Sequence, residues 1–257
     1  MAVYSNLYGQ RAALNAGDPL AQGLIGWWPL NEAGGTTSFD ATGNGTMGIA
    51  TGTPTHAPAP LGHSFKFDGS TQYLTYTVNA ILNPGEQSIT AWIKATSFPN
   101  AYNAIVNRIA AGNAFYQQLF VKSDGKLAIY LSHGPNYDGS GVHTLVADRW
   151  YFIAWTFRDS NMIGYVNAEL DASPAPSGNP TLDAFAGQLT IAQDLGSGGR
   201  LFAGQIADVR VYNRALTPSD LLMLYRDPSR PLRVPRSPMP DMPAAAAAYR
   251  ARVVRWG

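Results

Sequence analysis

The chain has 257 residues, of which 46% are hydrophobic and only 14% are charged, and it contains 26 glycines and 18 prolines. These proportions are typical of short strands joined by many turns, and an all-β sandwich of this length can be one domain. The absence of cysteine excludes disulfides and thiolate metal sites. Residues 1–22 lack the features of a signal peptide and no 18 consecutive residues are apolar, so we expect neither Sec-type export nor membrane insertion.

Charge and proline content divide the chain into three segments. Residues 1–225 hold 11 Lys and Arg against 15 Asp and Glu, a net charge of −4, whereas residues 226–257 hold 7 Arg against 2 Asp, a net charge of +5. We predict an N-terminal arm (1–22), a sandwich domain (23–226) and a basic Pro/Ala-rich tail (227–257), in which residues 242–250 could be helical. The tail adds few apolar residues, so we expect the sandwich to fold without residues 228–257.

The arm leaves two alternatives open, because Tyr4, Leu7, Tyr8 and Leu14 could form one face of a short helix or belong to a loose segment. Beyond it, alternating apolar residues predict strands. These strands are expected at 63–67, 73–78, 87–95, 104–109, 115–121, 126–131, 150–157, 162–166, 188–192 and 201–212.

Two turns predict hairpins between neighbouring strands. Ser123-Asp-Gly125 separates two alternating apolar runs, which is a strong hairpin signal. Arg158–Asn161 makes a second turn after the run Trp150–Phe157. That run is apolar on both faces, so we expect a central strand that is covered on both sides.

The segment from Ile206 to Leu224 predicts a strand followed by a capped helix. Its alternation places Ile206, Asp208, Arg210 and Tyr212 on one face and Ala207, Val209 and Val211 on the other. Thr217 precedes Pro218 and stands three residues before Asp220, the pattern of a helix start. We expect Leu221, Leu222 and Leu224 to pack against the strands.

Five ordered motifs resemble those of the laminin-G-like, concanavalin-A-like jelly-roll domains. They are Gly23–Glu32 with Asp40–Gly45, Ser64–Gly69 with Tyr73–Leu74, Ser88–Lys94, Trp150–Phe157 and Arg200–Leu224. The resemblance covers about residues 22–226. It implies an all-β fold, a two-sheet antiparallel jelly-roll sandwich with a short C-terminal helix. Lectins, adhesion modules and family-16-type glucanases share this fold, so the side chains have to decide the function.

The resemblance also suggests one metal, because several related jelly rolls hold a calcium ion at a rim of the sandwich. The matching motifs contain the oxygen-bearing residues Asp40, Asn44, Asp68 and Asp208. Asp and Asn also favour turns by binding their own backbone, which is the alternative explanation. We therefore expect no cofactor other than a structural calcium ion.

A carbohydrate site needs an exposed aromatic ring beside groups that bind hydroxyls. Tyr102 and the segment with Asn136, Tyr137 and Asp138 offer these groups, and the alternative is that they belong to ordinary solvated loops. The tryptophans Trp27, Trp28, Trp92 and Trp155 are expected in the core.

Catalysis is not expected. Glu169-Leu-Asp171 resembles the start of the glucanase signature, but no third acid follows. The four histidines lie in no recognisable nucleophile motif. A family-16-type glycoside hydrolase is therefore the least favoured function.

The layout of arm, jelly roll and basic tail resembles virion proteins of tailed bacteriophages. We predict a non-catalytic structural or decoration protein of the virion, assembled in the host cytoplasm, which forms homo-oligomers and contacts capsid or other virion proteins. The expected anchors are aromatic and arginine residues near the two ends. They are Tyr4, Tyr8, Arg233, Arg236, Tyr249, Arg252 and Trp256.

The alternative function is a carbohydrate-binding adhesion module that binds a host-surface glycan. Nucleic-acid binding is not expected, because the arginines of the tail are spread among prolines without interleaved aromatic residues.

Overall fold

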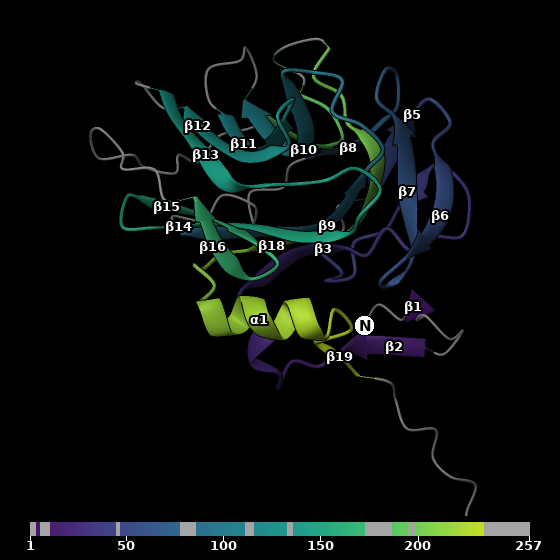
Figure 1. Cartoon of the computed structure of the whole chain (residues 1–257). Coiled ribbons are helices and arrows are strands. Elements are labelled where there is room, and N and C mark those ends of the chain that lie inside the picture. Colours follow the sequence, from purple (N-terminus) through teal and green to yellow (C-terminus); the bar gives the residue numbers. More distant parts are fainter. Residues whose placement is uncertain are drawn as a thin grey trace, which may run out of the picture.

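The computed structural model describes residues 4–5, 11–44, 47–77, 86–110, 116–132, 136–172, 187–194, 196 and 199–233. Two antiparallel sheets lie face to face, and a helix covers the outer side of one of them (Figure 1). The predicted all-β jelly-roll sandwich is thus confirmed.

One layer is named here the β10 sheet. Its strands in spatial order are β13 (Asn136–Thr144), β12 (Lys126–Ser132), β11 (Tyr116–Lys122), β10 (Tyr102–Ala110), β17 (Gly187–Ile191), β8 (Tyr73–Thr77), β5 (Gly48–Thr51) and β4 (Thr37–Ser38).

The other layer is the β9 sheet. Its order is β16 (Glu169–Ala172), β15 (Asn161–Val166), β14 (Tyr151–Arg158), β9 (Gln87–Ala95), β18 (Ala203–Tyr212), β7 (Gly62–Asp68) and β6 (Thr55–Ala59), and β3 (Leu24–Trp28) also pairs with β18.

The main core lies between the two sheets and takes alternate residues from each strand. On β14, Ile153, Trp155 and Phe157 point into this core, whereas Phe152 and Ala154 pack on the opposite side of the sheet. The prediction of a central strand covered on both sides is therefore confirmed. The four tryptophans expected in the core are all buried.

Both predicted hairpins are confirmed. Strands β11 and β12 pair from Val121 and Leu127 outward, and Gly125 between them has a φ of 78°, a conformation that favours glycine. Strands β14 and β15 pair up to Arg158 and Asn161. Both connections are short, so each strand pairs with its neighbour in sequence.

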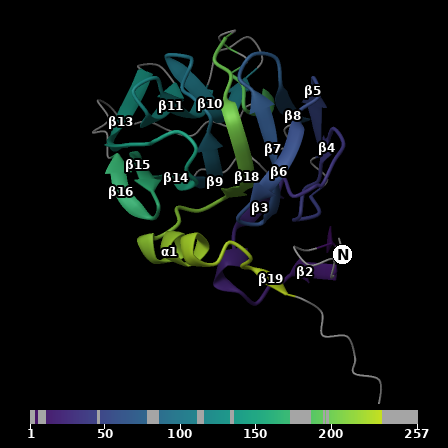
Figure 2. The ribbon, with the colours of Figure 1, turned by 45° about the vertical axis from the view of Figure 1, so that its right-hand side comes forward.

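A second apolar layer covers the outer face of the β9 sheet. It is formed by the helix α1 (Pro218–Arg226), which Figure 2 shows beside the sandwich, and the 3₁₀ turn η1 (Pro19–Ala21). Leu221 of α1 and Leu20 of η1 belong to the same apolar cluster as Trp27 and Trp92. Leu224 is buried as expected, but 38% of Leu222 is exposed. The prediction for Leu222 is wrong, because one step along a helix turns that side chain about 100° away from Leu221.

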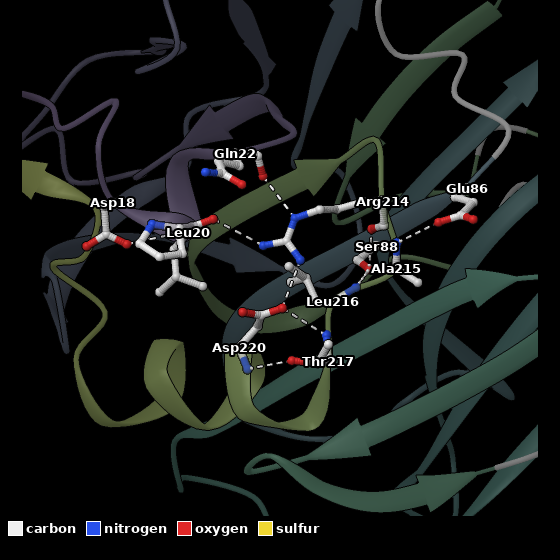
Figure 3. A network of polar contacts seen from close by, with 11 residues as sticks. Asp18, Leu20, Gln22, Glu86, Ser88, Arg214, Ala215, Leu216, Thr217 and Asp220 are labelled. Carbon is white, nitrogen blue, oxygen red and sulfur yellow. Dashed lines mark hydrogen bonds and ion pairs between the residues drawn. The ribbon is translucent and has the colours of Figure 1, made fainter.

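The predicted start of α1 is confirmed as a capping box. The Thr217 hydroxyl accepts a hydrogen bond from Asp220 N at 3.1 Å, and the Asp220 carboxylate accepts one from Thr217 N at 3.0 Å. Arg214 donates to Asp220 at 2.8 Å and to the carbonyls of Gln22 and Pro19, as Figure 3 shows. This network fixes α1 to the N-terminal segment. No helix in the described ranges is long and apolar enough to cross a membrane.

A β-bulge at Asp208 reverses the predicted faces of β18. The register against β9 shifts between Ala207 and Arg210, and Asp208 has a φ of 52°, in the left-handed region. Ile206 consequently packs between the sheets with Val209 and Val211, whereas Ala207 lies with Tyr212 in the outer layer. The prediction that Ile206 shares a face with Arg210 and Tyr212 is wrong, because the extra residue of the bulge breaks the period of two.

The two ends of the described chain meet in a small third sheet. Its order is β1 (Tyr4–Ser5), β2 (Arg11–Leu14) and β19 (Leu232–Arg233). Leu14 therefore lies in a strand, and the helix alternative is wrong for this residue. Tyr8 and the segment 242–250 lie outside the described residues.

Contacts with the sandwich continue past Asp227. The buried Arg210 guanidinium donates to the carbonyls of Pro228 and Arg230. Arg230 in turn forms an ion pair with Asp18 at 2.8 Å. Residues 228–233 are thus packed against the domain rather than separate from it.

Candidate functional site

An aromatic face lies on the outer side of the β10 sheet. We use this name for Tyr102, Phe120 and Tyr130 together with the small residues Ala104 and Ala128. Phe120 pairs across the strands with Ala104 on β10 and Ala128 on β12, so both cross-strand partners of this ring are small. The Tyr102 ring meets Phe120 edge-on, with 5.4 Å between the ring centroids. Phe120 is buried, whereas Tyr102 and Tyr130 are partly accessible.

The alternation of each strand explains why polar groups share this face. On β11, Leu119 and Val121 point into the core, so Gln118 and Lys122 point outward with Phe120. Gln118 pairs with Tyr130 on one side and with Asn107 on the other, and Asn107 pairs with Thr190. From β13 to β17 this row crosses four strand spacings, roughly 19 Å.

Arg200 and Asp194 add charge to the aromatic face. The Arg200 guanidinium carbon lies 4.9 Å from the centroid of Tyr102 and 5.9 Å from that of Phe120, which are cation–π distances. Its Nη1 donates to Asp194 Oδ2 at 3.0 Å, and Gln118 Nε2 donates to Asp194 Oδ1 at 2.9 Å. Burial raises the pKa of Asp194, although contacts with Gly196 and Arg200 oppose the rise.

The segment around Gln193 folds over part of the polar row. Asn107 Nδ2 and Thr190 Oγ1 both donate to the Gln193 carbonyl, at 2.9 and 2.6 Å. Within the described part of the chain, Asn107 Oδ1 and Gln193 Oε1 are buried and have no hydrogen-bond partner. Buried amide oxygens are costly when unpaired, so they favour a ligand or water that donates to them.

This combination has the chemistry of a carbohydrate site. Partly accessible aromatic rings suit the apolar face of a sugar, and amide, guanidinium and ammonium groups suit its hydroxyls. Lys122 pairs with Tyr102 across the strands, and its Nζ lies 3.2 Å from Ser140 Oγ. The face therefore offers donors on both sides of the Tyr102 ring.

The structure brings two of the expected ligand-binding positions to this face. Tyr102 is part of it, and Asp138 pairs with Tyr130. Asn136 pairs with Ser132 and belongs to the same alternating set as Asp138, whereas Tyr137 pairs with the core residue Leu131. The side chains of residues 136–138 lie outside the described part.

Sequence reasoning missed Asp194, Arg200, Gln118 and Tyr130. Arg200 and Asp194 come from a connection far along the chain from β10 and β11, and only strand pairing brings them to Tyr102. The signal that was present in the sequence is the alternation of β11, in which Gln118 and Lys122 flank Phe120 on the outward positions.

The residues expected to bind calcium make hydrogen bonds with other protein groups. Asp40 Oδ1 accepts from Trp27 N at 3.1 Å and Thr42 N at 2.9 Å, and Asp208 accepts from Trp27 Nε1 at 2.7 Å and from Arg210. Asn44 Nδ2 donates to the carbonyl of Ile25. The contacts of Asp40 and Asp208 occupy oxygen lone pairs that an ion would need.

Asp68 caps its own turn in the same manner. It accepts from the backbone N–H groups of Ser70, Thr71 and Gln72 at 2.9, 2.9 and 3.1 Å. Burial acts to raise its pKa, but the hydrogen bonds outweigh it and hold the pKa of Asp68 well below its usual range. Within the described ranges, no three His, Asp or Glu residues lie together as a metal site. Calcium binding stays a prediction.

Asp171 of the glucanase-like motif joins the edges of the two sheets. Its Oδ1 accepts from Val142 N at 3.0 Å, from His143 N at 2.7 Å and from His143 Nδ1 at 2.7 Å. Its side chain is fully buried, whereas Glu169 is exposed. This carboxylate therefore holds β16 against β13, and the contacts give it a structural role.

The expected anchor residues lie at the limits of the description. Tyr4 and Arg233 belong to β1 and β19 of the small third sheet, and their side chains are not described. The other five expected anchors, Tyr8, Arg236, Tyr249, Arg252 and Trp256, lie outside the described residues.

Residues 68–221 match the family model of the concanavalin A-like lectin/glucanases superfamily. The match spans more than half of the chain, so the chain belongs to this superfamily, as the ordered motifs predicted. No curated protein matches the chain in sequence.

Several solved structures share the fold. Domain 4 of the GH43 extracellular arabinanase AbnA from Geobacillus stearothermophilus, in complex with arabinotriose, has a TM-score of 0.67 at 19% identity, and the match covers 79% of this chain and 98% of that one. The binding domain of Paraclostridial Mosquitocidal Protein 1 has a TM-score of 0.66 at 14% identity, covering 80% and 52%. A Trypanosoma rangeli sialidase has a TM-score of 0.60 at 14% identity, covering 79% and 33%. At these identities the likeness concerns the fold.

Proposed function

We propose that this protein is a carbohydrate-binding module that binds an oligosaccharide along the aromatic face of the β10 sheet. The observation that carries the proposal is the Arg200 guanidinium 4.9 Å from the partly accessible Tyr102 ring, on a face that also carries the partly accessible Tyr130. Aromatic rings provide the apolar contact, and the polar row across the strands provides hydrogen bonds along an extended ligand.

The arabinanase domain supports this proposal, because the match covers almost all of a domain whose structure contains arabinotriose. The mosquitocidal protein and the sialidase support it less. The match leaves about half of the first chain and two thirds of the second uncovered, so their ligands can be bound by other parts.

Replacing the central ring tests the proposal. We expect Tyr102→Ala to weaken binding of an oligosaccharide at least tenfold, which corresponds to about 1.4 kcal/mol, because both the platform and the support of Arg200 are lost. Tyr102→Phe is the matched control and should stay within about threefold, since it keeps the ring. Calorimetric titration with a panel of soluble oligosaccharides, arabinotriose included, measures both. Absence of binding to the whole panel, or equal affinity of Tyr102→Ala, would refute the proposal.

We further propose that binding occurs without hydrolysis. Backbone and histidine groups of β13 hold Asp171 Oδ1, and the side chain is fully buried, so within the described part of this motif exposed Glu169 has no accessible second carboxylate for acid–base chemistry. Release of reducing sugar from a β-glucan that disappears in Glu169→Gln would contradict this.

The finer role that we propose is decoration of a tailed-phage virion, with assembly in the host cytoplasm. The small sheet of β1, β2 and β19 lies on the side of α1, whereas the β10 sheet forms the opposite layer (Figure 1). Such an arrangement suits a domain that is anchored by its two ends and that turns its aromatic face outward. Hydrogen exchange of residues 1–20 and 228–257 should slow when the protein joins a particle, and equal exchange in both states would count against anchoring.

A further inference from the structure

A groove of about 310 Å³ lies on the outer face of the β9 sheet, next to the start of α1. One wall is the β14–β15 hairpin and the other is the segment from Ala215 to Pro218, which leads into the helix. The aromatic face belongs to the opposite sheet, so the two features are separate.

The walls of the groove are held by specific contacts. Ser88 Oγ donates to the Arg214 carbonyl at 2.9 Å and accepts from Leu216 N at 2.8 Å, and the capping box fixes Thr217. Figure 3 shows these residues converging beside Glu86. On the other wall, Arg158 Nε donates to Glu86 Oε1 at 3.2 Å. Glu86 therefore links both walls, because its second oxygen also accepts from Ala215 N. The groove is preformed.

The floor is apolar and aromatic. Ile163 and Tyr165 of β15 line it, together with Leu216 and Pro218 from the opposite wall. Burial raises the pKa of the Tyr165 hydroxyl, although a hydrogen bond with Thr156 opposes the rise, so the hydroxyl stays protonated at neutral pH. This floor suits the C–H groups of a ring rather than a charged ligand.

The rim carries groups that bind hydroxyls. Asn161 Nδ2 donates to the carbonyl of Asp159, the Asp159 side chain is 84% exposed and that of Arg158 is 61% exposed. A carboxylate, an amide and a guanidinium within four residues provide acceptors and donors for hydroxyl groups. Ligand pockets usually begin at about 300 Å³, so this groove has room for a small ligand such as a single sugar unit.

We propose that this groove is a second carbohydrate site, which takes a single sugar unit, with Tyr165 and Ile163 beneath the ring and Asn161, Asp159 and Arg158 on its hydroxyls. The site goes beyond the oligosaccharide binding on the aromatic face and does not depend on it.

Amide chemical shifts can locate the binding. The ¹⁵N-labelled full chain is titrated with arabinose, galactose, glucose and mannose, each up to about 50 mM, where millimolar affinities saturate. We expect saturable shifts at Asn161, Ile163 and Leu216 with at least one sugar. Asn161→Ala, at an exposed position, should weaken this binding at least fivefold, the loss of about one hydrogen bond.

Two control variants separate the groove from the rest of the protein. Ser123→Ala, in the turn of the other hairpin, and Tyr102→Ala, on the aromatic face, should both leave the groove titration unchanged. The inference is wrong if no sugar shifts the groove amides, or if the shifts persist unweakened in Asn161→Ala. Neither result bears on the proposed oligosaccharide site on the aromatic face. That site is tested separately, by comparing oligosaccharide binding of wild type and Tyr102→Ala.

Discussion

The boundary between domain and tail can be tested by two truncations that differ by six residues. A chain ending at residue 233 keeps β19 and the carbonyls that Arg210 binds, whereas a chain ending at 227 loses them. Arg210 is fully buried, and its other partners include the carboxylate of Asp208 at 2.9 Å. The shorter chain therefore leaves part of a guanidinium without acceptors.

The expected magnitude follows from these contacts. A hydrogen bond to a charged group contributes about 1.5–3 kcal/mol, and water can reach the freed guanidinium after truncation, so we take the lower value for each of the two bonds. The loss is then about 3 kcal/mol. The Arg230–Asp18 pair adds little, because the Arg230 side chain is 37% exposed. For a domain of this size, 3 kcal/mol lowers the melting temperature by roughly 6–12 °C.

Thermal melting followed by circular dichroism compares the full chain, the chain ending at 233 and the chain ending at 227. We expect the first two to melt together and the third to melt at least 6 °C lower. This differs from the expectation from sequence that residues 228–257 are dispensable as a block. Equal melting temperatures of the two truncated chains would refute the structural reasoning. They would support the sequence-based expectation that all of residues 228–257 are dispensable for folding.

Two further substitutions probe the capping box and the sheet edge. Burial acts to raise the pKa of Asp220, but hydrogen bonds from Arg214 and Thr217 outweigh it and lower the pKa below its usual value. An acid with a lowered folded pKa stabilises the fold above its unfolded pKa of about 3.9 and loses this contribution as the pH falls through the folded value. The melting temperature of wild type should thus drop more steeply below about pH 4 than that of Asp220→Asn, and parallel curves would contradict this. In Gly141→Ala the new Cβ would overlap Asp171 Oδ2, so β13 and β16 should separate and expose strand edges. We expect a lower melting temperature and concentration-dependent association in size-exclusion chromatography, neither of which the neighbouring Ser140→Ala should show.

Local chemistry made much of the fold predictable. The strand at 87–95 was expected with the bounds that β9 has, because the apolar residues Ile89, Ala91, Ile93 and Ala95 recur at every second position. The hairpin at Gly125 and the capping box at Thr217 depend on residues within four positions of each other. Interactions of such short range can be predicted directly from the sequence.

Long-range contacts set the limit of prediction. The bulge at Asp208 depends on Trp27 Nε1 and Arg210, which hold the carboxylate on the outer side of the sheet, and no periodicity reveals it. The same holds for Asp171, whose resemblance to a catalytic acid gave no hint that it caps the edge of β13.

The sequence by itself determined the class of this protein: an all-β sandwich of the concanavalin A-like superfamily with a capped helix, since alternation, turn residues and caps act over a few positions. The positions of the candidate binding sites became apparent from the folded arrangement of the strands and the helix. Tyr102, Gln118 and Arg200 meet because strands far apart in the sequence pair in one register, and the groove at Tyr165 exists because α1 returns to cover part of the β9 sheet. Pairing and packing between distant segments depend on the whole core, so a local pattern cannot specify them.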